Sequence, residues 1–419
     1  MPHYPLGQPI PDSVHAVCCS LPTVADVCGY EEGDPAVVER VKWAYPRFVF
    51  HRYVLDVMTR VTQVRLSRGQ RFFATVNARA AEGLLAFAAP GAGALVSWHG
   101  VDGAALPDDP ATFARAKAYL QHAGVCLSSR AAERFLLAEG VLASAQPEVR
   151  AADDAALADV LAPLVAPAAP QLATSGMNAV HAAMGAAAAL QAPRGRRVVL
   201  QLGWLYLDTQ EVLQKLLPPD TEVVVLPDVT DTAAVEALFA RRGSELAAVV
   251  TEVPTNPLIQ VPDLPRLAAL CRAQGVVLVV DPSLAGVVNL DVLPWCDVLV
   301  CSLTKYAANA GDVMMGLLAV HPESPFAAEL AEGIAARLEP PDRDDRLRLA
   351  AQIGQMGAVA KEANARAEAI GDWLAGHLAV RRVHRPDPQR LAPLQRPGMG
   401  RGAILSFELA GPLEAFYDR

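Results

Sequence analysis

Short apolar runs alternate with amphipathic segments between about residues 195 and 320, and no other feature constrains the fold as strongly. The apolar runs are rich in Val and Leu without regular polar alternation, which is typical of strands covered on both faces. The amphipathic segments open with an Asp or Thr and close with a basic residue and Gly, as capped helices do. The pattern therefore predicts an α/β fold with a mainly parallel sheet and helices on both faces. We expect strands at 196–203, 221–227, 246–254, 276–281 and 296–302, and helices at 230–243 and 263–275.

The rest of the chain is arranged around this sheet. With 419 residues, 52% of them hydrophobic, the sequence is long enough for two or three domains. We expect an N-terminal arm and extension at 1–150, the α/β domain at 151–325 and a smaller α+β domain at 326–419. A long helix at 344–378 is predicted to lead into the last domain, which we expect to be incomplete because "PLEAFYDR" ends as a helix begins.

Composition narrows the classes of partner and site. A formal net charge of −9 argues against nucleic acid or an anionic membrane as the main partner, and leaves small molecules and other subunits. The sequence shows no signal peptide and no apolar stretch long enough to span a bilayer, so we expect a cytoplasmic protein. Seven cysteines without a CxxC pair and nine histidines without an HxH or HxxxH pair predict reduced thiols and no metal site.

Lys305 is one of only five lysines among 36 basic residues, and it follows the predicted strand 296–302. Burial at a strand end lowers the pKa of an amine, as attack on a carbonyl to form a Schiff base requires. The alternative is a lysine whose ammonium group extends into solvent. Asp281 ends the strand 276–281, at the edge where α/β proteins bind ligands. Its carboxylate would suit the pyridinium nitrogen of pyridoxal phosphate (PLP), or would cap the next segment.

Other candidate residues follow the same strand ends and one helix start. "TSGMNAV" places Ser175, Gly176 and Met177 at the start of a helix, where free N–H groups can bind a phosphate or simply be capped. Ser302 and Thr304 could add hydroxyl groups beside Lys305.

Two further candidates come from the loops after neighbouring strands. Asn256 in "TEVPTNP" could bond a ring oxygen, and Tyr206 in "GWLYLDTQ" could stack on a flat ring. Turn formation and ordinary packing are the alternatives for these two residues.

Together these strings resemble the PLP-dependent enzymes of cysteine and methionine metabolism, the cystathionine γ-synthase group. The family pattern is Ser-x-Thr-Lys-Tyr with an Asp seven residues after the lysine, while "TEVPTNP" and "SGM" are similar to its Glu-x-Pro-Thr-Asn-Pro stretch and phosphate loop. The order and spacing of four strings over 174–316 make the resemblance specific. The matching residues of the lysine motif are Ser302, Thr304, Lys305, Tyr306 and Asp312.

The resemblance implies the PLP-dependent transferase fold type I, similar to aspartate aminotransferase, and it implies roles for the candidates. Lys305 would hold PLP covalently and act with Tyr206 in catalysis, and Tyr206 would stack on the ring. Asp281 would pair with the pyridinium nitrogen, and Asn256 would contact the side of the ring hydroxyl. The phosphate would be held by Ser175, Gly176, Met177, Ser302 and Thr304.

The resemblance also implies a neighbouring subunit at the site. Tyr45 and Arg47, in "YPR", would reach the phosphate of that neighbour, so a homo-oligomer, either a dimer or a tetramer, is implied. The sequence departs from the family pattern at Asn309 and Ala310, where the family has Gly-His. The family's arginine for the substrate carboxylate follows a strand like "ILSFEL", and the sequence ends before it, with only Arg396 and Arg401 nearby.

The function implied is γ-replacement, in which a thiol displaces the acyl group of an O-acylated homoserine. The alternatives are a γ-lyase acting on a sulfur amino acid and a non-catalytic relative that serves as an assembly partner. A nucleotide-binding α/β protein would need GxGxxG or GxxxxGK[ST] after a strand, and neither motif occurs.

Overall fold

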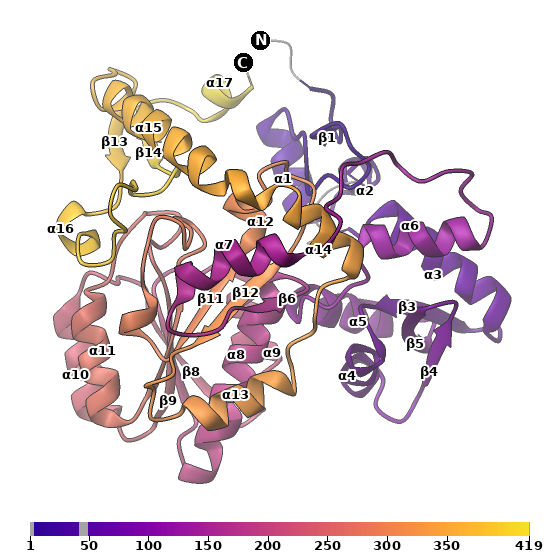
Figure 1. Cartoon of the computed structure of the whole chain (residues 1–419), viewed down its shortest axis with the longest axis horizontal. Coiled ribbons are helices and arrows are strands. Elements are labelled where there is room, and N and C mark those ends of the chain that lie inside the picture. Colours follow the sequence, from indigo (N-terminus) through magenta and orange to yellow (C-terminus); the bar gives the residue numbers. More distant parts are fainter. Residues whose placement is uncertain (1–3, 42–48, 419) are drawn as a thin grey trace.

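The computed structural model describes residues 4–41 and 49–418, and its centre is a seven-stranded sheet with helices on both sides (Figure 1). The strands pair in parallel except β12, which runs antiparallel to both of its neighbours. The predicted mainly parallel sheet is confirmed, and all five predicted strands belong to it. In sheet order the strands are β6 (Gln171–Ala173), β12 (Gly316–Val320), β11 (Val298–Ser302), β10 (Val277–Asp281), β9 (Leu246–Glu252), β7 (Val198–Leu202) and β8 (Glu222–Leu226).

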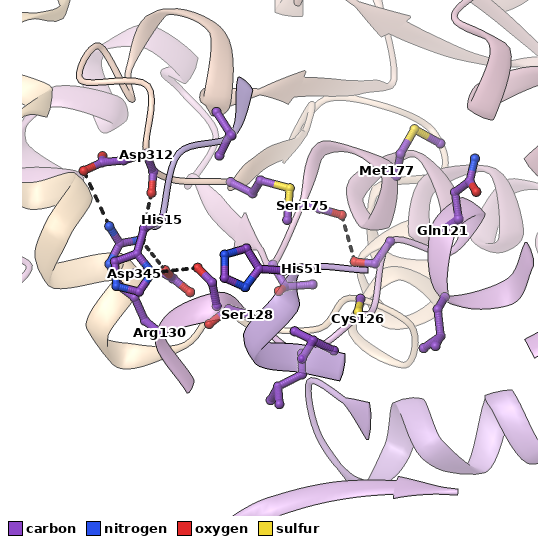
Figure 2. A pocket seen from close by; sticks show the side chains of 18 of the residues that line it. His15, His51, Gln121, Cys126, Ser128, Arg130, Ser175, Met177, Asp312 and Asp345 are labelled. Atoms are coloured by element: carbon purple, nitrogen blue, oxygen red, sulfur yellow. Dashed lines mark hydrogen bonds and ion pairs between the residues drawn. The ribbon is translucent and has the colours of Figure 1, made fainter. Parts of the chain in front are cut away.

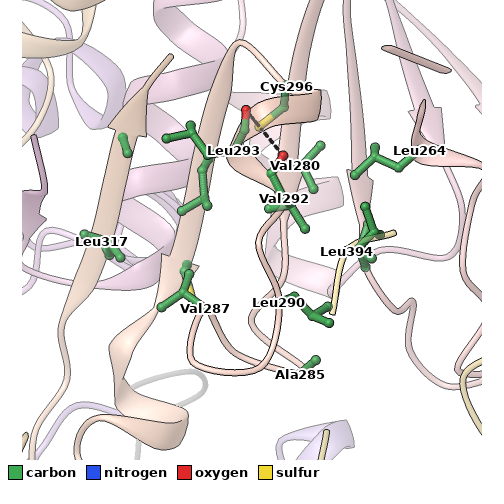
Figure 3. Packing of buried hydrophobic residues seen from close by; sticks show 14 of the residues in the cluster. Leu264, Val280, Ala285, Val287, Leu290, Val292, Leu293, Cys296, Leu317 and Leu394 are labelled. Carbon is green, nitrogen blue, oxygen red and sulfur yellow. Dashed lines mark hydrogen bonds between the residues drawn. The ribbon is translucent and has the colours of Figure 1, made fainter. Parts of the chain in front are cut away.

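Both faces of the sheet are buried, which explains why its strands lack polar alternation. On β10, Leu278 and Val280 enter one core and Val277 and Val279 enter the other. Figure 3 shows Val280 and other residues of the first core packing together. Helices α7 (Ala155–Val165), α10 (Thr232–Arg242) and α11 (Leu264–Gln274) contribute to the first core, and α8 (Gly176–Gln191), α9 (Leu207–Lys215) and α13 (Ala327–Ala335) to the second.

Residues 49–142, which we call the N-terminal unit, form a separate antiparallel sheet with its own core. Phe72, Phe73 and Leu84 are fully buried there. The unit contains α3 (Arg52–Arg65), β3 (Gln70–Thr75), α4 (Ala78–Ala88), β4 (Ala94–Trp98), β5 (Val101–Pro107), α5 (Pro110–His122) and α6 (Ser129–Ala138). Before it lie β1 (Pro9–Ile10), β2 (Cys18–Cys19), α1 (Val24–Glu32) and α2 (Pro35–Val38).

The long helix predicted at 344–378 is interrupted. The structure has α14 (Arg343–Ala350), a 3-10 turn η3 (Ile353–Gln355) and then α15 (Met356–Ala375). The carbonyl of Gln352 accepts a hydrogen bond of 2.9 Å from the Asn309 side chain. Gly354 follows two residues later, and glycine destabilises the interior of a helix. These two features end the first helix. The proposed division into three domains stays a prediction.

The C-terminal part adds a two-stranded antiparallel sheet beside α15. Figure 1 shows this part in yellow. Its last described residues contact the N-terminal segment, because Asp418 accepts a 2.8 Å hydrogen bond from Val24 N–H and Tyr417 donates a 2.9 Å bond to the carbonyl of Leu21. The strand expected in "ILSFEL" and the helix expected in "PLEAFYDR" are both present. The remaining elements are η1 (Ala192–Arg194), η2 (Leu293–Trp295), α12 (Leu303–Tyr306), β13 (Val380–His384), α16 (Pro388–Leu391), β14 (Ser406–Leu409) and α17 (Glu414–Tyr417).

Candidate active site

Lys305 lies on the single helical turn α12, directly after β11, at the carboxyl end of the parallel strands. Lys305 is exposed to solvent, so the structure favours the alternative in which its ammonium group reaches water over full burial. The surrounding protein removes part of the hydration of the ammonium group and lowers the pKa of Lys305, while Cys18 and Asp281 oppose this change. An accessible amine with a lowered pKa can act both as a nucleophile and as a proton carrier.

Asp281 ends β10, the strand next to β11. One carboxylate oxygen accepts a 2.7 Å hydrogen bond from the backbone N–H of Ser283, whose hydroxyl accepts a 2.7 Å bond from the N–H of Ser302. Burial raises the pKa of Asp281 to about 6, although Ser283 and the charge of Lys305 counteract this effect. The carboxylate that the sequence placed at the sheet edge is thus held in a fixed position close enough to influence Lys305.

Glu252 is a second acid at the same edge, and the sequence analysis gave it no role. It ends β9, where it pairs in register with Asp281, and it is only 8% exposed. Its carboxylate accepts a 2.6 Å hydrogen bond from the N–H of Tyr206. Burial, reinforced by the neighbouring charge of Asp281, raises the pKa of Glu252 to about 8. At neutral pH the proton therefore stays on Glu252, and Asp281 is the carboxyl group that carries the negative charge.

The start of α8 closes over the end of β11. Ser175 caps α8: its hydroxyl accepts a 3.0 Å bond from the N–H of Asn178 and donates a 2.8 Å bond to the carbonyl of Gly124. Gly176 is packed tightly, because a Cβ there would lie 2.9 Å from the Cβ of Ser302. The helix start and Ser302 therefore meet, as the sequence predicted, and their contact leaves no room for a larger residue.

Thr304 and Met177 occupy buried positions beside this contact. The hydroxyl of Thr304 accepts a 3.2 Å bond from the N–H of Met315, and Met177 lies in the first turn of α8. The hydroxyl of Ser175 is committed to the helix cap and to Gly124. Any phosphate at this helix start would therefore meet backbone N–H groups before it met that hydroxyl.

Tyr206 and Asn256 are both joined to Glu252. Tyr206 precedes the first residue of α9, and its side chain is hydrogen-bonded to the buried Asp208. Asn256 lies exposed in the loop after β9, and its backbone N–H bonds Glu252. The structure thus gathers Lys305, Asp281 and the loops of these two residues at the carboxyl ends of adjacent strands.

The remaining candidates are two residues outside the described part of the chain and two arginines of its C-terminal part. Tyr45 and Arg47 lie outside the described residues. Arg401 forms a two-point ion pair with Glu368, with distances of 2.8 and 2.6 Å, and Arg396 bonds two backbone carbonyls and Asp291. Both arginines therefore have structural partners, and no sequence motif assigns either of them to the substrate carboxylate.

The residues present fit PLP. The accessible amine of Lys305 suits an aldehyde, and the ionised carboxylate of Asp281 suits the pyridinium nitrogen. The start of α8, packed against Ser302, suits a phosphate. The sheet and this edge together define a PLP enzyme of fold type I.

Comparison with known proteins gives the family. The sequence pattern of "Cys/Met metabolism PLP-dependent enzyme" matches residues 150–418, so the chain belongs to this family of PLP-dependent enzymes. Its members act on amino-acid substrates. The fold and the cofactor implied by the resemblance are confirmed.

Three individual proteins show similarity to the chain. It is 38% identical, over 98% of its length and 84% of the other, to the L-2-amino-4-chloropent-4-enoate dechlorinase/desaturase of Streptantibioticus cattleyicolor. It is 25% identical to the cystathionine gamma-synthase of Neurospora crassa, over 100% of its length and 88% of the other. The crystal structure of cystathionine gamma synthase from Xanthomonas oryzae pv. oryzae shares its fold, with a TM-score of 0.52 and 22% identity over 62% of this chain and 66% of that one.

Proposed function

We propose that this enzyme eliminates chloride from the γ-carbon of an unsaturated amino acid of the L-2-amino-4-chloropent-4-enoate type. The observation that supports elimination is Lys305, an accessible amine with a lowered pKa beside a pair of carboxyl groups. The choice of leaving group is supported by the 38% identity with the dechlorinase/desaturase, which extends over 98% of the chain. The match to the family pattern, in contrast, does not include the part of the chain before residue 150.

The proposed reaction removes HCl from the substrate. Chloride leaves Cγ with the bonding electron pair, and one proton leaves the carbon chain, so the product has one further unsaturation. PLP, when bound, supplies an electron sink for negative charge that develops on the substrate carbons. No oxidant or reductant is consumed.

The residues of the chain supply positions and protons. Lys305 would remove the proton from Cα and return a proton to the product, because its lowered pKa leaves more neutral amine near pH 7. Asp281 would hold the positive charge of the pyridinium nitrogen. Glu252, whose carboxyl is protonated near neutral pH, would keep the loop of Tyr206 in place through the 2.6 Å hydrogen bond.

A second candidate function is the γ-replacement predicted from the sequence, with an O-acylated homoserine and a thiol. The alignment with the Neurospora crassa cystathionine gamma-synthase over the whole chain favours it. The leaving group of an O-acylhomoserine also sits on Cγ, so the same proton removal by Lys305 precedes both reactions. A γ-lyase reaction on a sulfur amino acid would begin with the same proton removal, but a thiolate would leave Cγ and no thiol would take its place. Water would then release the remaining carbon chain as a 2-oxo acid together with ammonia.

The test offers the purified holoenzyme three substrates in parallel: L-2-amino-4-chloropent-4-enoate, O-acetylhomoserine with cysteine, and cystathionine. Free chloride and the mass of the amino-acid product are measured, with Lys305→Ala and the exposed Lys361→Ala as matched variants. We expect chloride release and a product lighter by HCl, abolished only in Lys305→Ala. Cystathionine formation without chloride release would favour the second candidate and contradict the first.

We also propose a homo-oligomer in which Tyr45 and Arg47 reach the neighbouring subunit's site. Mixing Lys305→Ala chains with Arg47→Ala chains tests this directly, since a mixed dimer contains one intact site. Activity in about a quarter of the sites is expected if subunits exchange at random, and none if each chain uses its own Arg47.

None of the described helices is long and apolar enough to cross a bilayer, and a cytoplasmic location stays a prediction.

A further inference from the structure

The N-terminal unit contacts two parts of the candidate active site, the start of α8 and the loop that follows Lys305. The carbonyl of Gly124 accepts the hydroxyl of Ser175 at 2.8 Å, at the start of α8. On the other side, Arg130 of α6 reaches the loop that follows Lys305. Figure 2 shows the cavity between these contacts, with Ser175 on one side and Arg130 and Asp312 on the other. The volume of this cavity is about 70 Å³.

Arg130 is buried, being 2% exposed, and it joins three segments of the chain. Its Nε and Nη2 bond the carboxylate of Glu148 at 2.8–3.1 Å. Its Nη1 bonds the backbone carbonyl of Asp312 at 2.8 Å and a carboxylate oxygen of Asp345 at 2.9 Å. Only the planar guanidinium group, with donors in a fixed fork, can satisfy these partners together.

Asp312 is also fixed from the opposite side, by the segment that interrupts the predicted long helix. Its carboxylate accepts a 2.8 Å bond from Arg348 and a 3.1 Å bond from Gln352. Gln352 bonds the backbone N–H of Ala310 as well, at 2.7 Å. The loop from Asn309 to Asp312 is therefore held between α6 and the α14–α15 junction.

The other contacts that hold the loop are mainly backbone hydrogen bonds, among them Gly311 N–H to the carbonyl of Ala308 and Val17 N–H to the carbonyl of Gly311, both at 2.9 Å. Residues 307–311 are Ala-Ala-Asn-Ala-Gly, so only one of their side chains can hydrogen-bond. Its two ends are tied together, because Leu303 N–H donates to the carbonyl of Met315 at 2.9 Å and Met315 N–H donates to Thr304 at 3.2 Å. A shift at Asp312 is thus transmitted to the turn that carries Lys305.

We propose that Arg130 is a positioning residue for the cofactor lysine, so that the N-terminal unit forms a working part of the active site. This inference rests on the proposed role of Lys305. It goes beyond the family pattern, which starts at residue 150 and so excludes Arg130. The relatives from Streptantibioticus cattleyicolor and Neurospora crassa align over 98% and 100% of the chain, and their alignments therefore extend into the N-terminal unit.

The test compares Arg130→Met with Arg134→Met in full-length protein. Arg134 lies one turn later on α6 and pairs with Asp342 and Asp344. Its side chain is 53% exposed, and among the described residues its hydrogen bonds and ion pairs do not include the loop 309–312. Arg130→Lys is the conservative variant, since it keeps the charge and loses the fork. Folding is checked by circular dichroism. The readouts are PLP affinity from visible absorption, the pH midpoint of that absorption, and hydrogen exchange of residues 306–316 without cofactor.

We expect Arg130→Met to weaken PLP binding about tenfold, to shift the pH midpoint and to speed exchange in 306–316. Arg130→Lys should recover part of each change, and Arg134→Met should stay within about twofold of wild type. A folded Arg130→Met with wild-type affinity, midpoint and exchange would overturn the proposal. If that variant does not fold, the same wild-type values in Arg130→Lys would overturn it. Failure of the wild-type protein to attach PLP at Lys305 would instead refute the proposed function.

Discussion

Replacing Glu252 by glutamine should make the cofactor-free protein more stable at high pH and leave it unchanged at low pH. Burial and the charge of Asp281 raise the pKa of Glu252 from 4.5 to about 8. The folded state therefore keeps a proton on Glu252 that the unfolded state has lost. Stability from this group is fully present below about pH 4.5 and is lost as the pH rises towards about 8. Glutamine cannot ionise and can still accept the hydrogen bond from Tyr206.

The size of the effect follows from the difference between the two pKa values. Each pH unit between them changes the free energy of unfolding by about 1.4 kcal/mol. From about pH 5.5 to about pH 7.5 the free energy of unfolding of the wild-type protein should fall by about 3 kcal/mol because of Glu252. In Glu252→Gln this contribution to the pH dependence should be absent. The difference between the two proteins isolates the contribution of this one carboxyl group.

The assay is urea unfolding of the cofactor-free protein, followed by circular dichroism across this pH range. Glu329→Gln is the matched control, because Glu329 is an exposed carboxylate on α13. We expect the free energy of unfolding of the control to change with pH as that of the wild type does. The free energy of unfolding of Glu252→Gln should rise increasingly above the wild-type value as the pH rises. Parallel curves for Glu252→Gln and wild type would refute the conclusion that Glu252 is buried and protonated beside Asp281.

Three further substitutions test the packing around the site and within the N-terminal unit. Gly176→Ala places a Cβ 2.9 Å from the Cβ of Ser302, so PLP affinity should fall by about 1–3 kcal/mol in a visible-absorption titration, whereas unchanged affinity would argue against a phosphate there. Asp208→Ala removes the acceptor of two side chains on α5 at 2.8 and 2.9 Å, and urea unfolding should show a loss of about 1–3 kcal/mol. Gly103→Ala places a Cβ 2.2 Å from the carbonyl of Phe73, so hydrogen exchange should quicken in the N-terminal unit; protection equal to wild type would contradict the packing.

The sequence predicted the sheet and much of its carboxyl edge because both depend on local patterns. Continuous apolar runs mark strands buried on both faces, and residues just after such strands gather at one edge. Lys305 and Asp281 were predicted to lie at this edge in this way, and their roles there stay a prediction. Ser175 and Gly176 were found because a helix start with small residues is recognisable along the chain.

The parts that were not predicted depend on contacts between distant segments. Glu252 was overlooked because its burial results from the pairing of β9 with β10, although its place at the end of an apolar strand was a usable signal. The interruption of the helix at Gln352 depends on its bonds to residues more than 40 positions earlier. Arg130 binds carboxylates at positions 148 and 345, so no single stretch of sequence reveals its role.

Borohydride reduction followed by peptide mapping tests the central claim most directly, namely that Lys305 is the residue that holds PLP. The chain has only five lysines, so the attachment site can be assigned without ambiguity. The purified protein is mixed with PLP, reduced, digested and examined by mass spectrometry, with Lys305→Ala treated in parallel. We predict one reduced PLP adduct per chain, on the peptide that contains Lys305, and none in the variant. An adduct on another lysine, or an equal adduct in Lys305→Ala, would contradict the account.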